Sequence, residues 1–74
     1  MTTGEIVRTA RETRGYTMQE LADRSGTSLQ TIFKIETDRV SPKMDTMLAI
    51  MRAMDYDVVF KPKYKGGYYG ESDD

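Results

Sequence analysis

The chain has 74 residues, 11 of them basic and 12 acidic, and contains neither cysteine nor histidine. A chain of this length buries only about 60% of its unfolded surface, which leaves little room for a walled catalytic cleft. Without cysteine there is no disulfide or thiolate metal site, and without histidine the commonest general base and metal ligand are missing. We therefore expect a single small domain that is not an enzyme and that holds no metal and no cofactor.

The start of the chain and its charge bear on location and partners. Met1 is followed by a polar run, and no stretch approaches the ~20 apolar residues of a membrane span, so we expect a cytoplasmic protein without a membrane partner. The net charge of −1 is unusual for a nucleic-acid binder, but residues 1–70 carry 9 acidic against 11 basic residues. A phosphate-binding face would require clustering of Arg24, Lys34, Arg39 and Lys43.

Capping signals mark the first three expected helices. Thr2 with Glu5 has the spacing of a capping box, and Gly15 suits a left-handed cap, which predicts a helix over 3–14. Its apolar stripe consists of Ile6, Val7 and Ala10. The second helix begins with another capping box, Thr17 and Glu20, and ends at Ser25 before Gly26. Ser28 then provides an N-cap for a third helix over 29–36.

The third helix has two different sides at ~100° per residue. The side expected to face a core carries Thr31, Ile32 and Ile35, and the opposite side carries Leu29, Gln30, Phe33 and Lys34. After Pro42, a fourth helix over 44–54 has the widest apolar face in the chain. This face consists of Met44, Met47, Leu48, Ile50, Met51 and Met54.

The pattern changes after the fourth helix. In residues 56–62, Tyr56, Val58 and Phe60 alternate with Asp57, Val59 and Lys61 until Pro62. Aromatic and β-branched residues dominate this run, which predicts an edge β-strand. Residues 63–74 are rich in glycine and charge, so we expect a disordered tail. Lys61, Lys63 and Lys65, interleaved with Tyr64, are explained equally well by a phosphate contact and by a solvated strand end.

The run YTMQELADRSGTSLQTIFKIE, from Tyr16 to Glu36, lies between RETRG and SPKMDTMLAIMRAM. Together these segments resemble the Cro and C1-repressor type of helix-turn-helix over residues 4–55. The matching positions are Arg11, Ala22, Gly26, Ile32, Glu36 and Pro42. The resemblance implies a mainly α fold of four to five short helices of the lambda-repressor-like type. Residues 1–55 would form a domain that binds double-stranded DNA, with the third helix in the major groove.

The resemblance also implies roles for individual residues. The implied DNA-facing positions are Thr17, Met18, Gln19, Thr27, Ser28, Leu29, Gln30, Phe33, Lys34, Arg39 and Lys43. Gln30 is the leading base reader, since its amide can pair with adenine and discriminate by roughly 1–3 kcal/mol. Lys34 would reach guanine or phosphate, and Arg39 and Lys43 would hold the DNA backbone. Arg11 and Glu36 match positions that form a structural ion pair in the family.

Two positions depart from the family pattern. The family often has glutamine where this chain has Met18 and Leu29, so that amide pair is lost. Leu29 and Phe33 instead form an apolar i, i+4 pair on the outward side. They could meet thymine methyl groups in the groove, or pack against Met18 or a partner subunit. Asp55 and Asp57 are best explained as solvated charges, and the methionines of the fourth helix as adaptable core.

The single expected strand predicts a homodimer. An unpaired strand leaves backbone donors and acceptors open, and a two-fold axis would let Val58, Val59 and Phe60 pair with a second copy. Such a dimer presents two third helices, which must lie about 34 Å apart to read an inverted repeat. We expect a sequence-specific regulator, most simply a repressor. The alternative is an antitoxin that binds DNA and a toxin protein, because the terminal strand resembles hip-type antitoxins; a small enzyme is the third hypothesis.

Overall fold

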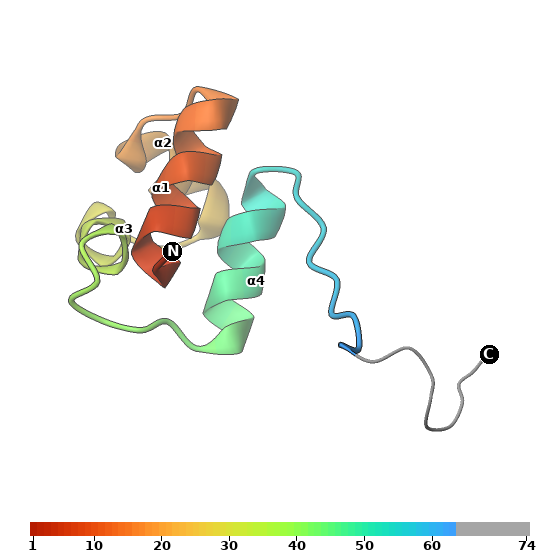
Figure 1. Ribbon diagram of the computed structural model, residues 1–74. Helices are drawn as coiled ribbons and strands as arrows, with labels where there is room; N and C mark the ends of the chain where they lie inside the picture. Colours follow the sequence, from red (N-terminus) through yellow and green to blue (C-terminus); the bar gives the residue numbers. More distant parts are fainter. Residues whose placement is uncertain (64–74) are drawn as a thin grey trace.

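The computed structural model describes residues 1–63, and this part of the chain contains four helices (Figure 1). They are α1 (Thr3–Arg14), α2 (Met18–Ser25), α3 (Leu29–Glu36) and α4 (Met44–Ala53). The expectation of a mainly helical chain with short helices is confirmed, and α4 ends one residue before the predicted boundary. None of these helices is long and apolar enough to cross a membrane.

Side chains cap the first three helices at their starts. The Thr2 hydroxyl accepts the Glu5 amide at 3.1 Å, while the Glu5 carboxylate accepts the Thr2 amide at 2.9 Å. Thr17 and Glu20 repeat this reciprocal pair at the start of α2. The Ser28 hydroxyl accepts the Thr31 amide at 3.1 Å and starts α3. These bonds satisfy amides that a helix leaves without partners in its first turn, so local sequence fixes where each helix begins.

The other helix ends differ from one another. Gly15 and Gly26 end α1 and α2 with φ of 78° and 75°, a conformation that glycine adopts without the strain of a β-carbon. α4 begins at Met44, and the side chain of its N-cap residue Lys43 makes no capping hydrogen bond. Within the first turn, the Asp45 carboxylate accepts the Thr46 amide at 2.7 Å.

The core lies where the four helices meet. α2 packs against α3 and α4, and α1 packs against the same two helices. The buried apolar side chains are Val7, Ala10, Leu21, Ala22, Ile32, Ile35, Ile50 and Met54. Burial of one large apolar side chain contributes about 1.5–3 kcal/mol, so these residues hold the four helices together.

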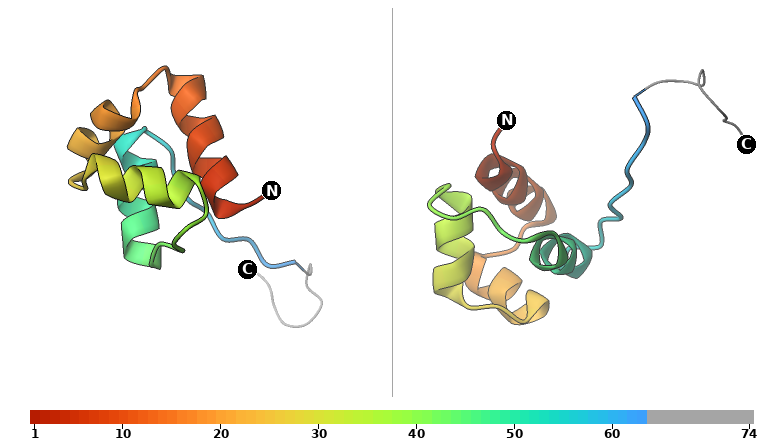
Figure 2. Two further views of the ribbon diagram at one scale, coloured as in Figure 1. Left: turned by 90° about the vertical axis from the view of Figure 1, so that its left-hand side faces the viewer. Right: turned by 90° about the horizontal axis from the view of Figure 1, so that it is seen from below.

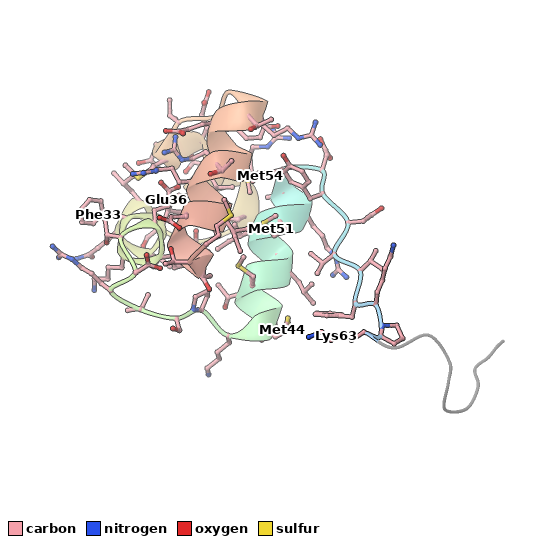
Figure 3. The ribbon with its side chains drawn as sticks, in the orientation of Figure 1. Phe33, Glu36, Met44, Met51, Met54 and Lys63 are labelled. Carbon is pink, nitrogen blue, oxygen red and sulfur yellow. The ribbon has the colours of Figure 1, made fainter. Side chains whose placement is uncertain are left out.

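The predicted apolar faces of the first and fourth helices are wider than the buried ones. Ile6 remains partly exposed and Met44 remains mostly exposed, whereas Met47 and Met51 pack at the edge of the core. Met44 is the first residue of α4, at the end of the helix away from Met54 (Figure 3). Helical periodicity identifies which side of a helix is apolar. It does not show how much of the length of that side the neighbouring helices cover.

The start of α1 lies against the end of α3. Gly4 is buried there, and a β-carbon on Gly4 would lie 2.5 Å from the carbonyl oxygen of Ile35. The Asp38 carboxylate accepts the Gly4 amide at 3.0 Å and the Thr2 hydroxyl at 2.8 Å. A carboxylate at this position also interacts favourably with the positive end of the helix dipole of α1. The loop after α3 is thus bonded to α1.

The predicted strand is not formed within the single chain. Among residues 1–63 the structure has no β-strand, and the residues after α4 run to Lys63 without regular structure. Val59 and Phe60 keep 68% and 72% of their surface exposed. The reason is that a strand needs a partner, and no other segment in the described part of the chain is extended beside it. The expected tail lies outside the described residues, except for Lys63.

Three contacts position the chain as it leaves α4. The Tyr56 ring lies under the Arg14 guanidinium, 4.6 Å from the ring centroid, and the Tyr56 amide donates to the Met51 carbonyl at 3.0 Å. Arg14 also donates to the carbonyl of Asp55 at 3.3 Å, and Asp55 has a positive φ of 63°. The segment after Tyr56 leaves on the side of α4 away from α3 (Figures 1 and 2).

Candidate nucleic-acid interface

α3 has one buried side and one exposed side. Ile32, Ile35 and Glu36 are buried against the rest of the domain. Leu29 and Phe33 keep 43% and 41% of their surface exposed. Figure 3 shows Phe33 pointing away from α1 and Glu36 lying on the α1 side. The assignment of core and outward sides made from the helical wheel therefore agrees with the structure.

Arg11 and Glu36 hold α1 and α3 together. The Nε and Nη2 atoms of Arg11 donate to the two carboxylate oxygens of Glu36 at 2.7 and 3.0 Å, and Nη1 donates to the Tyr16 carbonyl at 2.8 Å. The two side chains are only 13% and 4% exposed. The hydrogen bond to Glu36 raises the pKa of Arg11 despite its burial, so the guanidinium stays charged. The pair fixes α3 from its buried side.

The turn between α2 and α3 is closed by hydrogen bonds. The Thr27 amide donates to the Ala22 carbonyl at 3.0 Å, and the Ser25 hydroxyl donates to the Leu21 carbonyl at 2.7 Å. The hydroxyls of Ser25 and Thr27 lie 3.0 Å apart. Thr27 is consequently half-buried and bonded inside the turn, which makes it a less accessible DNA contact than its neighbours.

The remaining positions that the resemblance assigns to DNA lie mostly at the surface. Seven of them are exposed polar or charged residues, namely Thr17, Gln19, Ser28, Gln30, Lys34, Arg39 and Lys43. Thr17 and Ser28 also cap helices, and the Gln19 amide donates to the Asp23 carboxylate at 3.0 Å. Met18 is half-buried and packs on the core. Gln30 and Lys34 are thus exposed polar positions on the outward side of α3.

The basic residues separate into two groups. Arg24 donates to the Ala53 carbonyl at 3.1 Å and lies 4.6 Å from the Tyr16 ring centroid, so its guanidinium holds α2 to the end of α4. Arg24 therefore already serves the fold, and its part in a phosphate-binding face with Lys34, Arg39 and Lys43 stays a prediction. Arg39 follows α3, and its guanidinium lies 5.5 Å from the Phe33 ring centroid. The positive charge near the outward side of α3 comes from Lys34 and Arg39.

The described residues 1–63 offer no group of side chains beside this surface that could hold a metal ion. One shallow depression is lined by Tyr16, Glu20, Asp23 and Arg24, and it opens to solvent. Asp55 and Asp57 are both exposed. The candidate site is thus a surface rather than a pocket.

Comparisons with known proteins agree with this geometry. The Helix-turn-helix family model matches residues 7–60. A relative from Sinorhizobium fredii (strain NBRC 101917 / NGR234), the uncharacterized HTH-type transcriptional regulator y4dL, is 33% identical over 57 residues. That match covers 77% of this chain but 29% of the relative, so the chain spans less than a third of the relative's length. No solved structure matches the chain.

Proposed function

The chain belongs to the Helix-turn-helix family of DNA-binding regulators, and from this premise we propose that it binds specific double-stranded DNA sequences through the outward side of α3. One observation carries the proposal. The buried side of α3 is fixed by Ile32, Ile35 and the Arg11–Glu36 pair, while its outward side remains exposed. A helix held in this way is presented to a groove without first having to be ordered.

Different contacts would serve sequence reading and positioning. Gln30 is the proposed base reader, because an amide can both donate to and accept from adenine in the major groove. Lys34 is proposed to reach guanine or phosphate. Ser28 is proposed to lie with Gln30 at the first-turn positions that read bases. Thr17, Met18, Arg39 and Lys43 are proposed to lie against the phosphate backbone, and Gln19 and Thr27 are further proposed DNA contacts. Phosphate contacts set the register of a protein on DNA but carry no sequence information directly.

We also propose that the chain acts as a homodimer through Val58, Val59 and Phe60. The support is that this segment is exposed, apolar and without a partner in the described residues. It leaves α4 on the side away from α3, so pairing with a second copy would leave both α3 helices uncovered (Figure 2). Antiparallel pairing about a two-fold axis would satisfy both backbones. A dimer on an inverted-repeat operator would act most simply as a repressor, by occluding a promoter.

The exposed segment also supports a second candidate, a DNA-binding antitoxin. In this case the apolar side chains of Val59 and Phe60 would be covered by a toxin protein. Both candidates share the DNA-binding side of α3. A genetic test distinguishes the two candidates. If the chain is an antitoxin, expression of the neighbouring toxin gene should stop growth, and co-expression of this chain should restore it.

DNA selection tests the main proposal directly. The chain is incubated with a random duplex pool, bound sequences are recovered over several rounds, and the enriched site is titrated by mobility shift. We expect an inverted repeat and an affinity that falls steeply as salt rises, because phosphate contacts release counterions. A variant carrying both Gln30→Ala and Lys34→Ala is the control and should enrich nothing. Failure of the wild-type chain to bind any duplex at low salt would contradict the proposal.

A further inference from the structure

The outward side of α3 contains an apolar pair in a position where polar readers are expected. Leu29 and Phe33 lie four residues apart, one helical turn, and each is about two-fifths exposed. An apolar side chain cannot use the donors and acceptors that distinguish bases. The one apolar group that a natural base pair offers in the major groove is the 5-methyl group of thymine. Cytosine presents the same group when it is methylated at C5.

Arg39 gives the Phe33 ring a defined neighbour. Its guanidinium lies 5.5 Å from the ring centroid, within the range of a cation–π interaction. Backbone bonds fix this residue beside the helix end, because the Arg39 amide donates to the Lys34 carbonyl at 2.8 Å. The ring is thus held by a cation that would itself be attracted to the DNA backbone. This arrangement limits the freedom that the ring would lose on entering a groove.

We infer that Leu29 and Phe33, with Arg39 against the ring, form a binding site for the 5-methyl group of a pyrimidine. The inference rests on the proposed DNA-binding function and names what the apolar part of α3 recognises. Burial of one methyl or methylene group corresponds to about 0.8 kcal/mol, which is about fourfold in affinity. The contact would therefore adjust sequence preference, and Gln30 would supply the larger discrimination.

Replacement of thymine by uracil tests this inference, because it removes only the methyl group. Each thymine of the selected operator is replaced in turn, and affinities are measured by fluorescence anisotropy. We expect the wild-type chain to lose about fourfold at one or two positions in each half-site. Phe33→Ala and Leu29→Ala should each bind the thymine and uracil duplexes with more nearly equal affinity. Ile6→Ala removes a partly exposed apolar side chain from α1 and should keep the wild-type ratio.

A second arm uses cytosine at the position identified by uracil. The T·A pair is replaced by C·G, and duplexes with and without the 5-methyl group are compared. If the wild-type chain binds the methylated C·G duplex more tightly than the unmethylated one, the site recognises the methyl group on either base. If only the replacement of uracil by thymine increases the affinity, the site recognises thymine alone. Both outcomes support the contact. Circular dichroism of the variants confirms that they remain folded.

Two results would overturn the inference. One is a thymine–uracil ratio of one at every position of an operator that the wild-type chain binds. The other is a ratio that persists unchanged in both Phe33→Ala and Leu29→Ala. In either case the proposed DNA-binding function would stand. It would fail only if the unmodified operator were not bound at all.

Discussion

The backbone of Gly4 lies so close to Ile35 that a β-carbon at position 4 would be 2.5 Å from the Ile35 carbonyl oxygen. The Glu36 carbonyl oxygen would be 2.6 Å away. Both neighbours are backbone atoms of α3, which cannot rotate aside as a flexible side chain would. The contact therefore limits position 4 to glycine, as long as α1 and α3 keep their present spacing.

The Gly4→Ala variant should lower the free energy of unfolding. In a helix interior, alanine is more favourable than glycine by about 1 kcal/mol. Overpacking a close contact costs about 1–3 kcal/mol or more. We expect the second effect to win because α1 must move away from α3. Urea denaturation measures the difference, with Thr9→Ala on the exposed side of α1 as control. An increase in stability for Gly4→Ala would show that α1 and α3 are not so close.

The Arg11–Glu36 pair should show strong coupling in a double-mutant cycle. Exposed pairs contribute about 0–1 kcal/mol, whereas loss of one partner of a buried pair costs about 3–5 kcal/mol. With side chains 13% and 4% exposed, we expect coupling above the range of exposed pairs. Arg11→Ala, Glu36→Ala and the double variant are compared by thermal unfolding. Additive losses in stability would contradict a coupled pair.

The stability that the Arg11–Glu36 pair contributes should not change near neutral pH, because Arg11 stays charged there. Its pKa is raised by the hydrogen bond to Glu36. A raised pKa means that the contribution is fully present below the unfolded-state value and is lost only as pH rises through the still higher folded-state value. Urea midpoints of the wild-type chain and Arg11→Lys, measured between pH 6 and 9, should therefore differ by a constant amount.

Gln30 and Lys43 should affect DNA binding in different ways. Gln30→Ala is expected to weaken the selected operator by roughly 1–3 kcal/mol and to relax preference at one or two base pairs. Lys43→Ala should weaken all duplexes about equally and reduce the salt dependence, because a phosphate contact is lost. Mobility-shift titrations on the operator and on a scrambled duplex separate these effects. Unchanged affinity and preference in Gln30→Ala would remove it as a base reader.

Arg24 should affect stability rather than DNA preference. Its guanidinium donates to the Ala53 carbonyl and stacks on Tyr16 at the exposed end of α2. Arg24→Ala should lower the free energy of unfolding by about 1 kcal/mol through these lost contacts. Lys34→Ala is the matched comparison, since it removes a cation from the outward side of α3 and should weaken DNA binding with little change in stability. Equal loss of DNA affinity in both variants would contradict this division.

Val59→Pro tests the proposed dimer. Proline removes a backbone donor and places a ring where the second copy would pair, so we expect monomers with poor operator affinity. Val59→Thr keeps a β-branched side chain and the backbone amide, and should remain dimeric. Light scattering at micromolar concentration measures the mass. A monomeric wild-type chain, or a dimeric Val59→Pro variant with full affinity, would contradict the assembly.

Local signals predicted the helices because they act within a few residues. The capping boxes at Thr2 and Thr17 and the left-handed glycines at Gly15 and Gly26 are short-range features, and the structure shows all four. The outward side of α3 also followed from helical period. The strand could not be established in the same way, since the alternating pattern of residues 56–62 does not contain its own partner.

Other features depend on where distant segments meet. The Arg24 side chain lies against Ala53, 29 residues away, and Asp38 bonds to the start of α1. Neither contact leaves a periodic signal in the sequence. The buried Gly4 has a weak signal, because glycine in the first turn of a well-capped helix suggests a close approach by another backbone. The sequence supplied candidate DNA-facing residues, while the structure shows which of these residues already serve the fold.

The missing side-chain cap at Lys43 has a consequence for local opening. The start of α4 lacks the glutamate that accepts the N-cap amide in α1 and α2, although Asp45 accepts the Thr46 amide. The Lys43 amide should therefore exchange with solvent faster than those of Thr2 and Thr17. Lys43 stands at this turn and is a proposed phosphate contact. Binding to DNA would then be linked to closure of the turn. Slower exchange of the Lys43 amide in the complex would report that closure separately from the contacts of α3.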